Sequence, residues 1–343
     1  MKKIYYYILL FFIPHLLYVS ITYYLDPFNY LKKENISGIT DEKVISDKMS
    51  NSTHYAYNYS QLMNSHNKVI LGDSRAKTLN IINDELEIED FFSLIHFRGL
   101  NIKEMSKIND ETNFFENSDE VVLFVSFDQF NDLKDYDRIS QQKKIYDSMN
   151  FLSHAYNINT IKLSSIIFTI KIGSFFSNEF ENKFFSIFLN KNNSKKDKNV
   201  FWEWHLKNVI KRDFDDFQYS YANEMLLKKI VKNCNLNNTK LTIVIPPSHI
   251  EYIDAQKSFV SDERKEFFRF MYTLNTLVVN YENNSNQYIY DKSQFKDSMH
   301  VNSRIDFKDS SIDLKRIINK EISTQNFKIG VTNNDINFIT YSE

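Results

Sequence analysis

Short apolar segments separated by long mixed segments constrain the fold of this chain more than any other feature. Five such segments occur along the sequence: Lys68–Leu71, Phe91–Ile95, Val121–Phe127, Leu241–Ile245 and Tyr288–Tyr290. They are continuous runs of β-branched and aromatic residues, which is typical of strands buried on both faces. Strands that alternate with helical segments form parallel sheets. The sequence therefore predicts an α/β domain built on a central parallel sheet.

The interval between the third and fourth segments is far longer than an ordinary crossover connection. It contains Phe-rich segments over 151–190, a Lys/Asn/Asp-rich loop over 190–199 and an aromatic patch that includes Trp202 and Trp204. We expect a helical insertion over about 133–222. The two tryptophans could stack on sugar rings, although aromatic residues in an insertion more often fill a core.

The N-terminus carries an apolar and aromatic run. Lys2 and Lys3 precede it, and no acidic residue interrupts it before Leu25. Its length suffices to span a bilayer, and tyrosines at both ends resemble interfacial belts. A cleaved signal peptide is the alternative, but it needs a shorter apolar core and a small-x-small cleavage site. We predict an uncleaved single-pass anchor over 1–25, with the remaining chain outside the cytoplasm, on the periplasmic side in a Gram-negative cell.

The predicted division of the remaining chain is a juxtamembrane linker over 26–67, an α/β domain over 68–323 and a C-terminal tail over 324–343. Lys and Arg number 42 against 44 Asp and Glu, so no basic excess points to nucleic-acid binding. The eight histidines show no metal-ligand spacing, and no Gly-rich phosphate loop is present. We expect neither a metal nor a cofactor, and a metal or nucleotide protein is the least supported class.

The first motif with chemical meaning is VILGDSR at 69–75, directly after the first predicted strand. Gly72 permits a tight turn, and Ser74 would open a helix at the edge where parallel sheets place their ligands. Backbone N–H groups at such a helix start stabilise negative charge, which suits a serine nucleophile. The alternative is that Asp73 or Ser74 only caps a helix.

The second motif is FKDSMH at 295–300. Asp297 and His300 are spaced so that the carboxylate can orient the imidazole while the imidazole reaches a serine. The spacing also occurs by chance, and an isolated histidine is more often structural or solvated.

In combination, Gly-Asp-Ser after the first strand and Asp-x-x-His after the last resemble the SGNH (GDSL-like) hydrolase superfamily. The resemblance covers roughly residues 68–320. It implies a flavodoxin-like three-layer α/β/α fold. It also implies that Ser74 is the nucleophile, His300 the general base and Asp297 the residue that orients it.

The intermediate blocks of the superfamily match less well. Gly99 follows the second strand and matches the glycine whose N–H joins that of the nucleophile in the oxyanion hole; an ordinary turn glycine is the alternative. In the third block, Ser126 and Asp128 stand where the family has glycine and asparagine. A carboxylate cannot donate a hydrogen bond unless it is protonated. Gln129 or Asn131 could replace the missing donor if the loop bulges.

Further candidates for contact with substrate lie near these motifs. Asp73 and Arg75 flank the nucleophile, and Asp128 follows the third strand. His249 follows a strand that ends in two prolines, which places a rigid loop at the same edge of the sheet. The alternative for His249 is a surface loop histidine.

The arrangement of an anchor, a linker and an SGNH-like domain with a weak third block resembles accessory proteins of alginate acetylation and teichoic-acid D-alanylation. The resemblance implies a membrane-bound O-acyltransferase as partner and a cell-surface polysaccharide or other acylated glycan as substrate. We expect a serine-dependent O-acyltransferase or esterase. The alternative is a catalytically inactive SGNH fold that binds glycan or acts as a scaffold. The departure at Asp128 favours that alternative, and the retained Ser74, Asp297 and His300 oppose it.

Overall fold

The computed structural model describes residues 12–21, 58–63, 66–79, 93–134, 137–148, 198–282, 287–301 and 339–340. The chain divides into two units, one formed by residues 1–61 with 140–195 and the other by 62–139 with 196–343. In the first unit, residues 12–21 and 140–148 are helical, and the rings of Tyr59 and Tyr146 lie 5.5 Å apart. The sheet and the site residues discussed below belong to the second unit.

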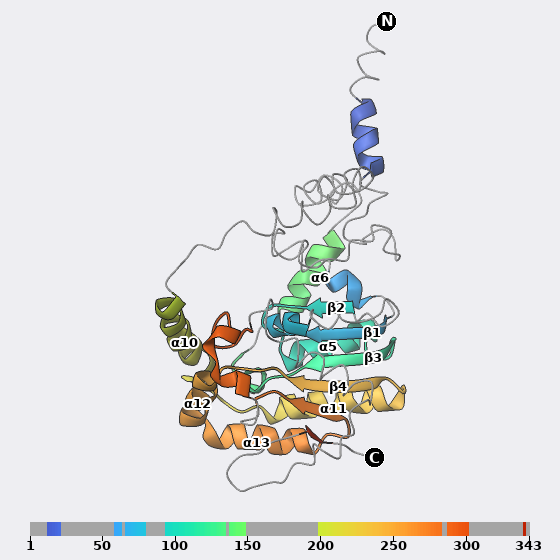
Figure 1. Cartoon of the computed structure of the whole chain (residues 1–343). Helices are drawn as coiled ribbons and strands as arrows, with labels where there is room; N and C mark the ends of the chain where they lie inside the picture. The colour runs from blue at the N-terminus through green and yellow to red at the C-terminus, as the bar shows by residue number, and fades with distance from the viewer. Residues whose placement is uncertain are drawn as a thin grey trace, which may run out of the picture. The chain divides into compact units, whose positions relative to one another are not determined.

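The second unit is built on a six-stranded sheet (Figure 1). Its strands are β1 (His66–Gly72), β2 (Ser93–His96), β3 (Ser118–Phe124), β4 (Lys240–Ile245), β5 (Leu277–Asn280) and β6 (Ile339–Thr340). They lie in the order β2-β1-β3-β4-β5-β6. The first five strands are parallel, and β6 pairs antiparallel with β5 at the edge. The predicted α/β architecture with a central parallel sheet is confirmed.

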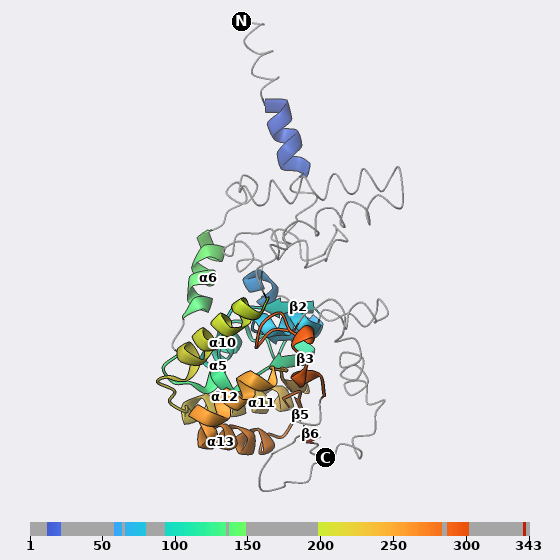
Figure 2. The same cartoon turned by 60° about the vertical axis from the view of Figure 1, so that its left-hand side comes forward.

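Helical segments connect the strands. The described ones are η1 (Ser74–Leu79), α5 (Ile102–Thr112), η3 (Phe127–Phe130), α6 (Arg138–Ser148), α10 (Lys198–Phe214), α11 (Tyr221–Leu236), α12 (Ile250–Phe259), α13 (Ser261–Tyr272), η4 (Gln287–Tyr290) and η5 (Lys292–Gln294). The start of α5 is fixed by a capping box in which Asn101 and Glu104 exchange side-chain-to-backbone hydrogen bonds. Helix α11 packs against α5 and β4, and α10 lies beside α12 (Figure 2).

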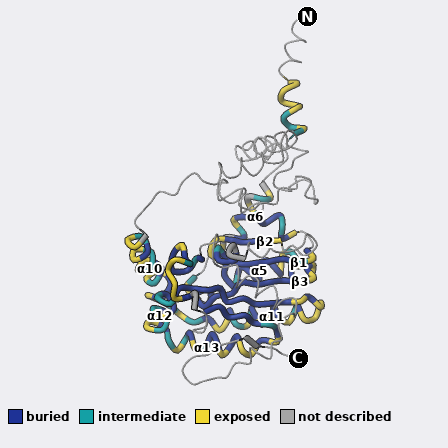
Figure 3. The backbone as a smooth tube through the Cα atoms, viewed as in Figure 1, coloured by how far each residue is buried: buried dark blue, intermediate teal, exposed yellow. Residues whose placement is uncertain are grey.

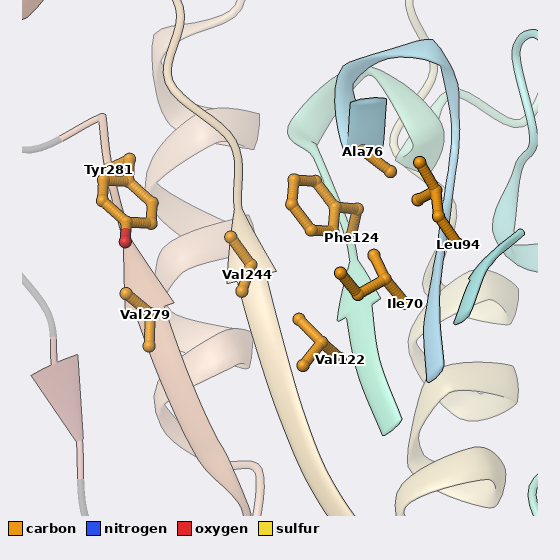
Figure 4. Close-up of a cluster of buried hydrophobic side chains, with 8 residues drawn as sticks. All are labelled: Ile70, Ala76, Leu94, Val122, Phe124, Val244, Val279 and Tyr281. Atoms are coloured by element: carbon orange, nitrogen blue, oxygen red, sulfur yellow. The ribbon is translucent and has the colours of Figure 1, made fainter. Parts of the chain in front are cut away.

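The sheet is buried along most of its length, as Figure 3 shows. Alternate residues of neighbouring strands meet in an apolar cluster on one face of the sheet (Figure 4). Its members are Ile70, Ala76, Leu94, Val122, Phe124, Val244, Val279 and Tyr281. The intervening residues, such as Val69 and Leu123, are equally buried. Burial of both faces explains why the strands read as continuous apolar runs.

The fifth predicted strand is wrong. Residues 288–290 lie in the short 3-10 helix η4, where Ile289 is buried and Tyr290 is exposed. The fifth strand is instead Leu277–Asn280, a run of four residues that pairs in parallel with β4. This run is too short to show a pattern in sequence, although its Val278 and Val279 have the β-branched side chains that strands favour.

Several described elements lie at or across the boundaries predicted from the sequence. Strand β1 begins at His66, slightly before the expected end of the linker, and Ile339–Thr340 of the expected tail form β6. Within the expected insertion, α6 and α10 are helical, whereas residues 149–197 lie outside the described part. Only residues 12–21 of the expected anchor are described. Among all described residues, no helix is both long and apolar enough to cross a membrane.

Gly72 allows the end of β1 to approach its neighbours closely. A Cβ atom at this position would lie 2.5 Å from the Cβ of Phe124 and 2.9 Å from that of Ala76.

We predict that Gly72→Ala lowers the free energy of unfolding by about 1–3 kcal/mol, because the end of β1 must shift. Urea denaturation measures this loss. Ser93→Ala, an exposed change on β2, serves as the control and should cost less than about 0.5 kcal/mol. Equal stability of both variants would contradict the close packing at Gly72.

Candidate active site

Ser74 is presented at the carboxyl end of β1. The strand ends at Gly72, and Ser74 is the first residue of η1. Between them, the Asp73 carboxylate accepts the backbone N–H of Arg75 at 2.8 Å, and the Asp73 carbonyl accepts the N–H of Ala76 at 3.0 Å. Both bonds turn the chain sharply and leave the Ser74 side chain partly exposed.

Asp297 and His300 form a tight loop. The carboxylate Oδ1 of Asp297 accepts the backbone N–H groups of Met299 at 3.0 Å and His300 at 2.9 Å. A bridge between Phe295 and Val301 closes the loop behind them. The imidazole Nδ1 of His300 lies 2.9 and 3.0 Å from the two carboxylate oxygens of Asp297. The local backbone therefore fixes the carboxylate against the imidazole.

The structure brings this loop to Ser74, 226 residues earlier in the chain. The Nε2 atom of His300 lies 2.8 Å from Ser74 Oγ. Burial acts to raise the pKa of Asp297, but the hydrogen bond and the charge of His300 outweigh it and hold that pKa at about 2. Asp297 is therefore ionised at neutral pH, and its carboxylate can accept a proton held on Nδ1 of His300. The free Nε2 lone pair then faces the serine hydroxyl, which is the geometry of a nucleophile and its base.

The backbone N–H groups of Ser74 and Gly99 lie just beyond the carboxyl ends of β1 and β2. Among the described residues, neither the N–H of Ser74 nor that of Gly99 donates a hydrogen bond. Gly99 has a φ of 67°, which glycine adopts without strain, and it is exposed in the turn after β2. The turn is tied to β1, because the N–H of Phe97 donates to the carbonyl of Gly72 at 3.0 Å. Ser74 and Gly99 thus remain the two candidate oxyanion donors.

Asp128 is an acceptor in a buried ion network. Its Oδ1 lies 3.0 Å from Arg75 Nη1, and its Oδ2 lies 3.3 Å from Lys134 Nζ. Burial favours the neutral acid, but Arg75 and Lys134 outweigh it and hold the pKa of Asp128 well below its usual range. An ionised carboxylate has no proton to donate. The residue at the position of the family asparagine therefore contributes no oxyanion donor.

The network continues on both sides of Asp128. Arg75 Nε donates to Asp73 Oδ2 at 2.9 Å, and an Arg75 amino group also donates to the hydroxyl of Ser126. On the other side, Lys134 Nζ lies 2.7 Å from Asp213 Oδ1, and Arg212 pairs with both oxygens of Asp213. Three carboxylates thus face three cations. The sequence had suggested that Asp73, Arg75 and Asp128 contact a substrate. In the structure all three are buried in these ion pairs instead.

The two amides proposed as replacement donors are already engaged. Gln129 Nε2 donates to the carbonyl of Leu100 at 2.9 Å, and its Oε1 accepts the N–H of Ser126. Asn131 Nδ2 donates to the carbonyl of Asp213 at 3.2 Å. Both side chains are buried. The loop after β3 forms the regular 3-10 turn η3, so the bulge that would have freed either amide is absent there.

His249 is neither a surface residue nor exposed to a substrate. It is 2% exposed and caps α12, where its Nδ1 accepts the N–H of Glu251. Its ring packs edge-on against Trp202 and Phe295. Trp202 is buried with them, in the core role that is commoner for such aromatics, whereas Trp204 is 60% exposed.

One residue near the site was not predicted from sequence. His205, on α10, places its Nε2 3.6 Å from Asp297 Oδ2. It belongs to the aromatic patch at 202–205, but nothing in that pattern indicates contact with a loop more than ninety positions later. Among the described residues, no group of three or more His, Cys, Asp or Glu side chains could hold a metal ion.

No protein-family model matches this sequence, and no curated protein matches it significantly. The assignment of the site therefore depends on its motifs and its geometry.

Removal of the Asp128 charge should disrupt the buried ion network and destabilise the fold. We predict that Asp128→Asn lowers the free energy of unfolding by about 3–5 kcal/mol, because Arg75 and Lys134 stay buried without their shared counter-charge. Asp132→Asn is the control: Asp132 is exposed and pairs with Lys103 at 3.3 Å, so its loss should cost about 1 kcal/mol or less. Urea unfolding of the full chain compares them. Similar small losses in both variants would show that the network does not stabilise the fold.

The low pKa of Asp297 predicts a defined pH dependence of stability. The folded-state pKa is about 2, below the value of about 4 in an unfolded chain. Asp297 therefore contributes about 3 kcal/mol above pH 5, and this contribution declines as the pH falls towards 2. The difference in unfolding free energy between the wild type and Asp297→Asn should narrow between pH 6 and pH 3. A constant difference between the two proteins over that pH range would contradict the low folded-state pKa of Asp297.

Proposed function

We propose that this chain is an SGNH-type serine-dependent O-acyltransferase or esterase that acts outside the cytoplasm on a cell-surface glycan. The observation that carries the proposal is the contact of 2.8 Å between Ser74 Oγ and His300 Nε2, with Asp297 on the other imidazole nitrogen. Three residues from two distant motifs meet in the order and orientation that acyl transfer requires.

The topology of the sheet supports the superfamily. The parallel strand order 2-1-3-4-5 is that of flavodoxin-like doubly wound sheets, the central layer of the α/β/α SGNH fold. In such sheets, ligands bind where the strand order reverses, and here the reversal lies between β1 and β3. Ser74 directly follows the end of β1 and Asp128 follows the end of β3. The proposed nucleophile is therefore at the position that this architecture favours for chemistry.

In the first proposed step, Ser74 Oγ attacks the carbonyl carbon of an acyl ester, and its proton moves to His300 Nε2. Asp297 accepts the Nδ1–H of the resulting imidazolium. The N–H groups of Ser74 and Gly99 stabilise the oxyanion of the tetrahedral intermediate. Collapse of that intermediate breaks the ester C–O bond, and the leaving oxygen takes the proton from His300. The product is an acyl-serine.

In the second proposed step, a hydroxyl of the acceptor loses its proton to His300 as its oxygen attacks the acyl-serine. Collapse returns the proton to Ser74 Oγ and releases the acylated acceptor. A polymer hydroxyl as acceptor gives transferase activity, and water gives esterase activity. The two outcomes differ in how well the site excludes water.

The cellular setting of the proposal follows the resemblance to polysaccharide-modifying accessory proteins. A membrane-bound O-acyltransferase would supply the acyl group, and the N-terminal segment would hold the chain at the membrane. The exposed side chains of Phe12, Leu16 and Leu17 on the helix at 12–21 are compatible with a lipid environment.

A binding or scaffolding role is the second candidate, and the ion pairs of Asp128 favour it. Loss of one oxyanion donor typically costs about 10²–10³ in rate. With Asp128, Gln129 and Asn131 all engaged elsewhere, the site retains two backbone donors where the superfamily has three donors.

Turnover of a generic acetyl ester by the full chain distinguishes the two candidates. We predict that Ser74→Ala abolishes turnover and that Asp297→Asn lowers it about 10⁴-fold, because the imidazole loses its correct tautomer. Ser293→Ala, an exposed serine of η5 in the same region, is the control and should turn over like the wild type. Addition of a polysaccharide with free hydroxyls should divert acyl groups from water if the protein is a transferase. Equal turnover by the wild type and Ser74→Ala would refute the mechanism and favour the binding role.

A further inference from the structure

His205 reaches the site from α10, outside the two motifs that carry the serine chemistry. Its Nε2 lies 3.6 Å from Asp297 Oδ2, and its Nδ1 lies 3.3 Å from the hydroxyl of Ser298. The side chain is 17% exposed. The Asp297 carboxylate therefore has two imidazoles close to it, that of His300 and that of His205.

The two oxygens of Asp297 are held differently. Oδ1 accepts the backbone N–H groups of Met299 and His300 as well as the His300 ring. Among the described residues, Oδ2 faces only the His300 ring and His205. Rotation of the carboxylate about its Cβ–Cγ bond would disturb its alignment with His300. His205 is the one described group beyond the loop itself that is placed to oppose this rotation.

The ionised carboxylate of Asp297 can only accept, so it favours the tautomer of His205 that carries its proton on Nε2. In that tautomer the hydroxyl of the buried Ser298 donates to Nδ1 of His205. Burial lowers the pKa of His205, with His300 and Arg212 acting in the same direction and Asp297 and Asp213 opposing. His205 is therefore a neutral donor to Asp297 at neutral pH and adds no positive charge beside His300.

The position of His205 is built into the packing of α10. Trp202, three residues earlier, forms a buried cluster with Phe295 and Val301, which flank the Asp297–His300 loop. The indole N–H of Trp202 also donates to Glu251 Oε2 at 2.7 Å. Helix α10 is thus attached to the loop by contacts independent of His205.

We propose that His205 is a positioning residue that donates from Nε2 to Asp297 Oδ2 and holds the carboxylate against His300. The distance of 3.6 Å is longer than a hydrogen bond in the free protein, and such contacts often shorten when a substrate binds. Only the kinetic consequence of this role rests on the proposed function, because the alignment of Asp297 and His300 can be measured without turnover.

Two substitutions separate the proposed role from simple packing. The amide nitrogen of His205→Gln replaces Nε2 and keeps a donor towards Asp297. The amide of His205→Asn occupies the place of Nδ1 and cannot reach Asp297.

The first measurement uses the full chain, labelled with ¹⁵N-histidine and held in mild detergent. Its spectrum reports the Nδ1–H resonance of His300, which is assigned by its loss in His300→Asn. We expect this resonance to be retained in the wild type and in the Gln variant, and broadened by exchange in the Asn variant.

The rate at which a fluorophosphonate probe phosphonylates Ser74, with loss of fluoride, gives the kinetic test. In His205→Asn, the maximal phosphonylation rate should fall about 10-fold while the probe concentration for half-maximal rate stays unchanged, a smaller loss than the roughly 10²–10⁴-fold cost of removing a general base. His205→Gln should react like the wild type.

The outcomes distinguish this inference from the proposed function. Identical His300 resonances in the wild type and both variants would overturn it. Equal losses of signal and of melting temperature in the Gln and Asn variants would also overturn it, because packing alone would explain them. A wild-type protein that does not react with the probe, but whose His300 resonance responds as expected, would support the positioning role and remove the proposed function.

Discussion

The guanidinium of Arg75 is enclosed between two carboxylates, Asp73 at the end of β1 and Asp128 beyond the end of β3. These ion pairs join the two strands at the place where the strand order of the sheet reverses. Ser74 stands between Asp73 and Arg75 in the chain, so its backbone cannot move without breaking buried charge pairs. Lys134 and Asp213 extend the same network and keep its charges balanced. The position of the proposed nucleophile thus depends on the buried ion pairs of its neighbours Asp73 and Arg75.

This constraint has a chemical consequence. The superfamily resembled by this chain places an asparagine donor where Asp128 stands, and an ion-paired carboxylate can only accept. The network therefore fixes Ser74 and leaves the proposed oxyanion hole without that donor. Backbone N–H groups of Ser74 and Gly99 remain for that purpose. Under the proposed function, such a site suits a slow or specialised acyl transfer. The acyl group would then pass to a bound acceptor hydroxyl and not to water.

The sequence predicted those features that depend on local pattern or on motif order. Continuous apolar runs identified four strands, and two short motifs identified Ser74, Asp297 and His300, which the structure brings together. Strand β5 was missed because four residues carry too little pattern. The contacts of Arg75 with Asp128 and of His205 with Asp297 were missed for another reason. They join side chains 53 or more positions apart, and their pairing depends on packing that no local spacing encodes.

Reaction of the full chain with an active-site serine acylating probe, read by intact mass and peptide mapping, tests the central claim most directly. A single adduct on Ser74, absent when His300 is replaced by alanine, is the predicted result. It would establish that the hydroxyl held 2.8 Å from the imidazole is a working nucleophile. A folded protein that gains no adduct, or gains one at another residue irrespective of His300, would contradict the account.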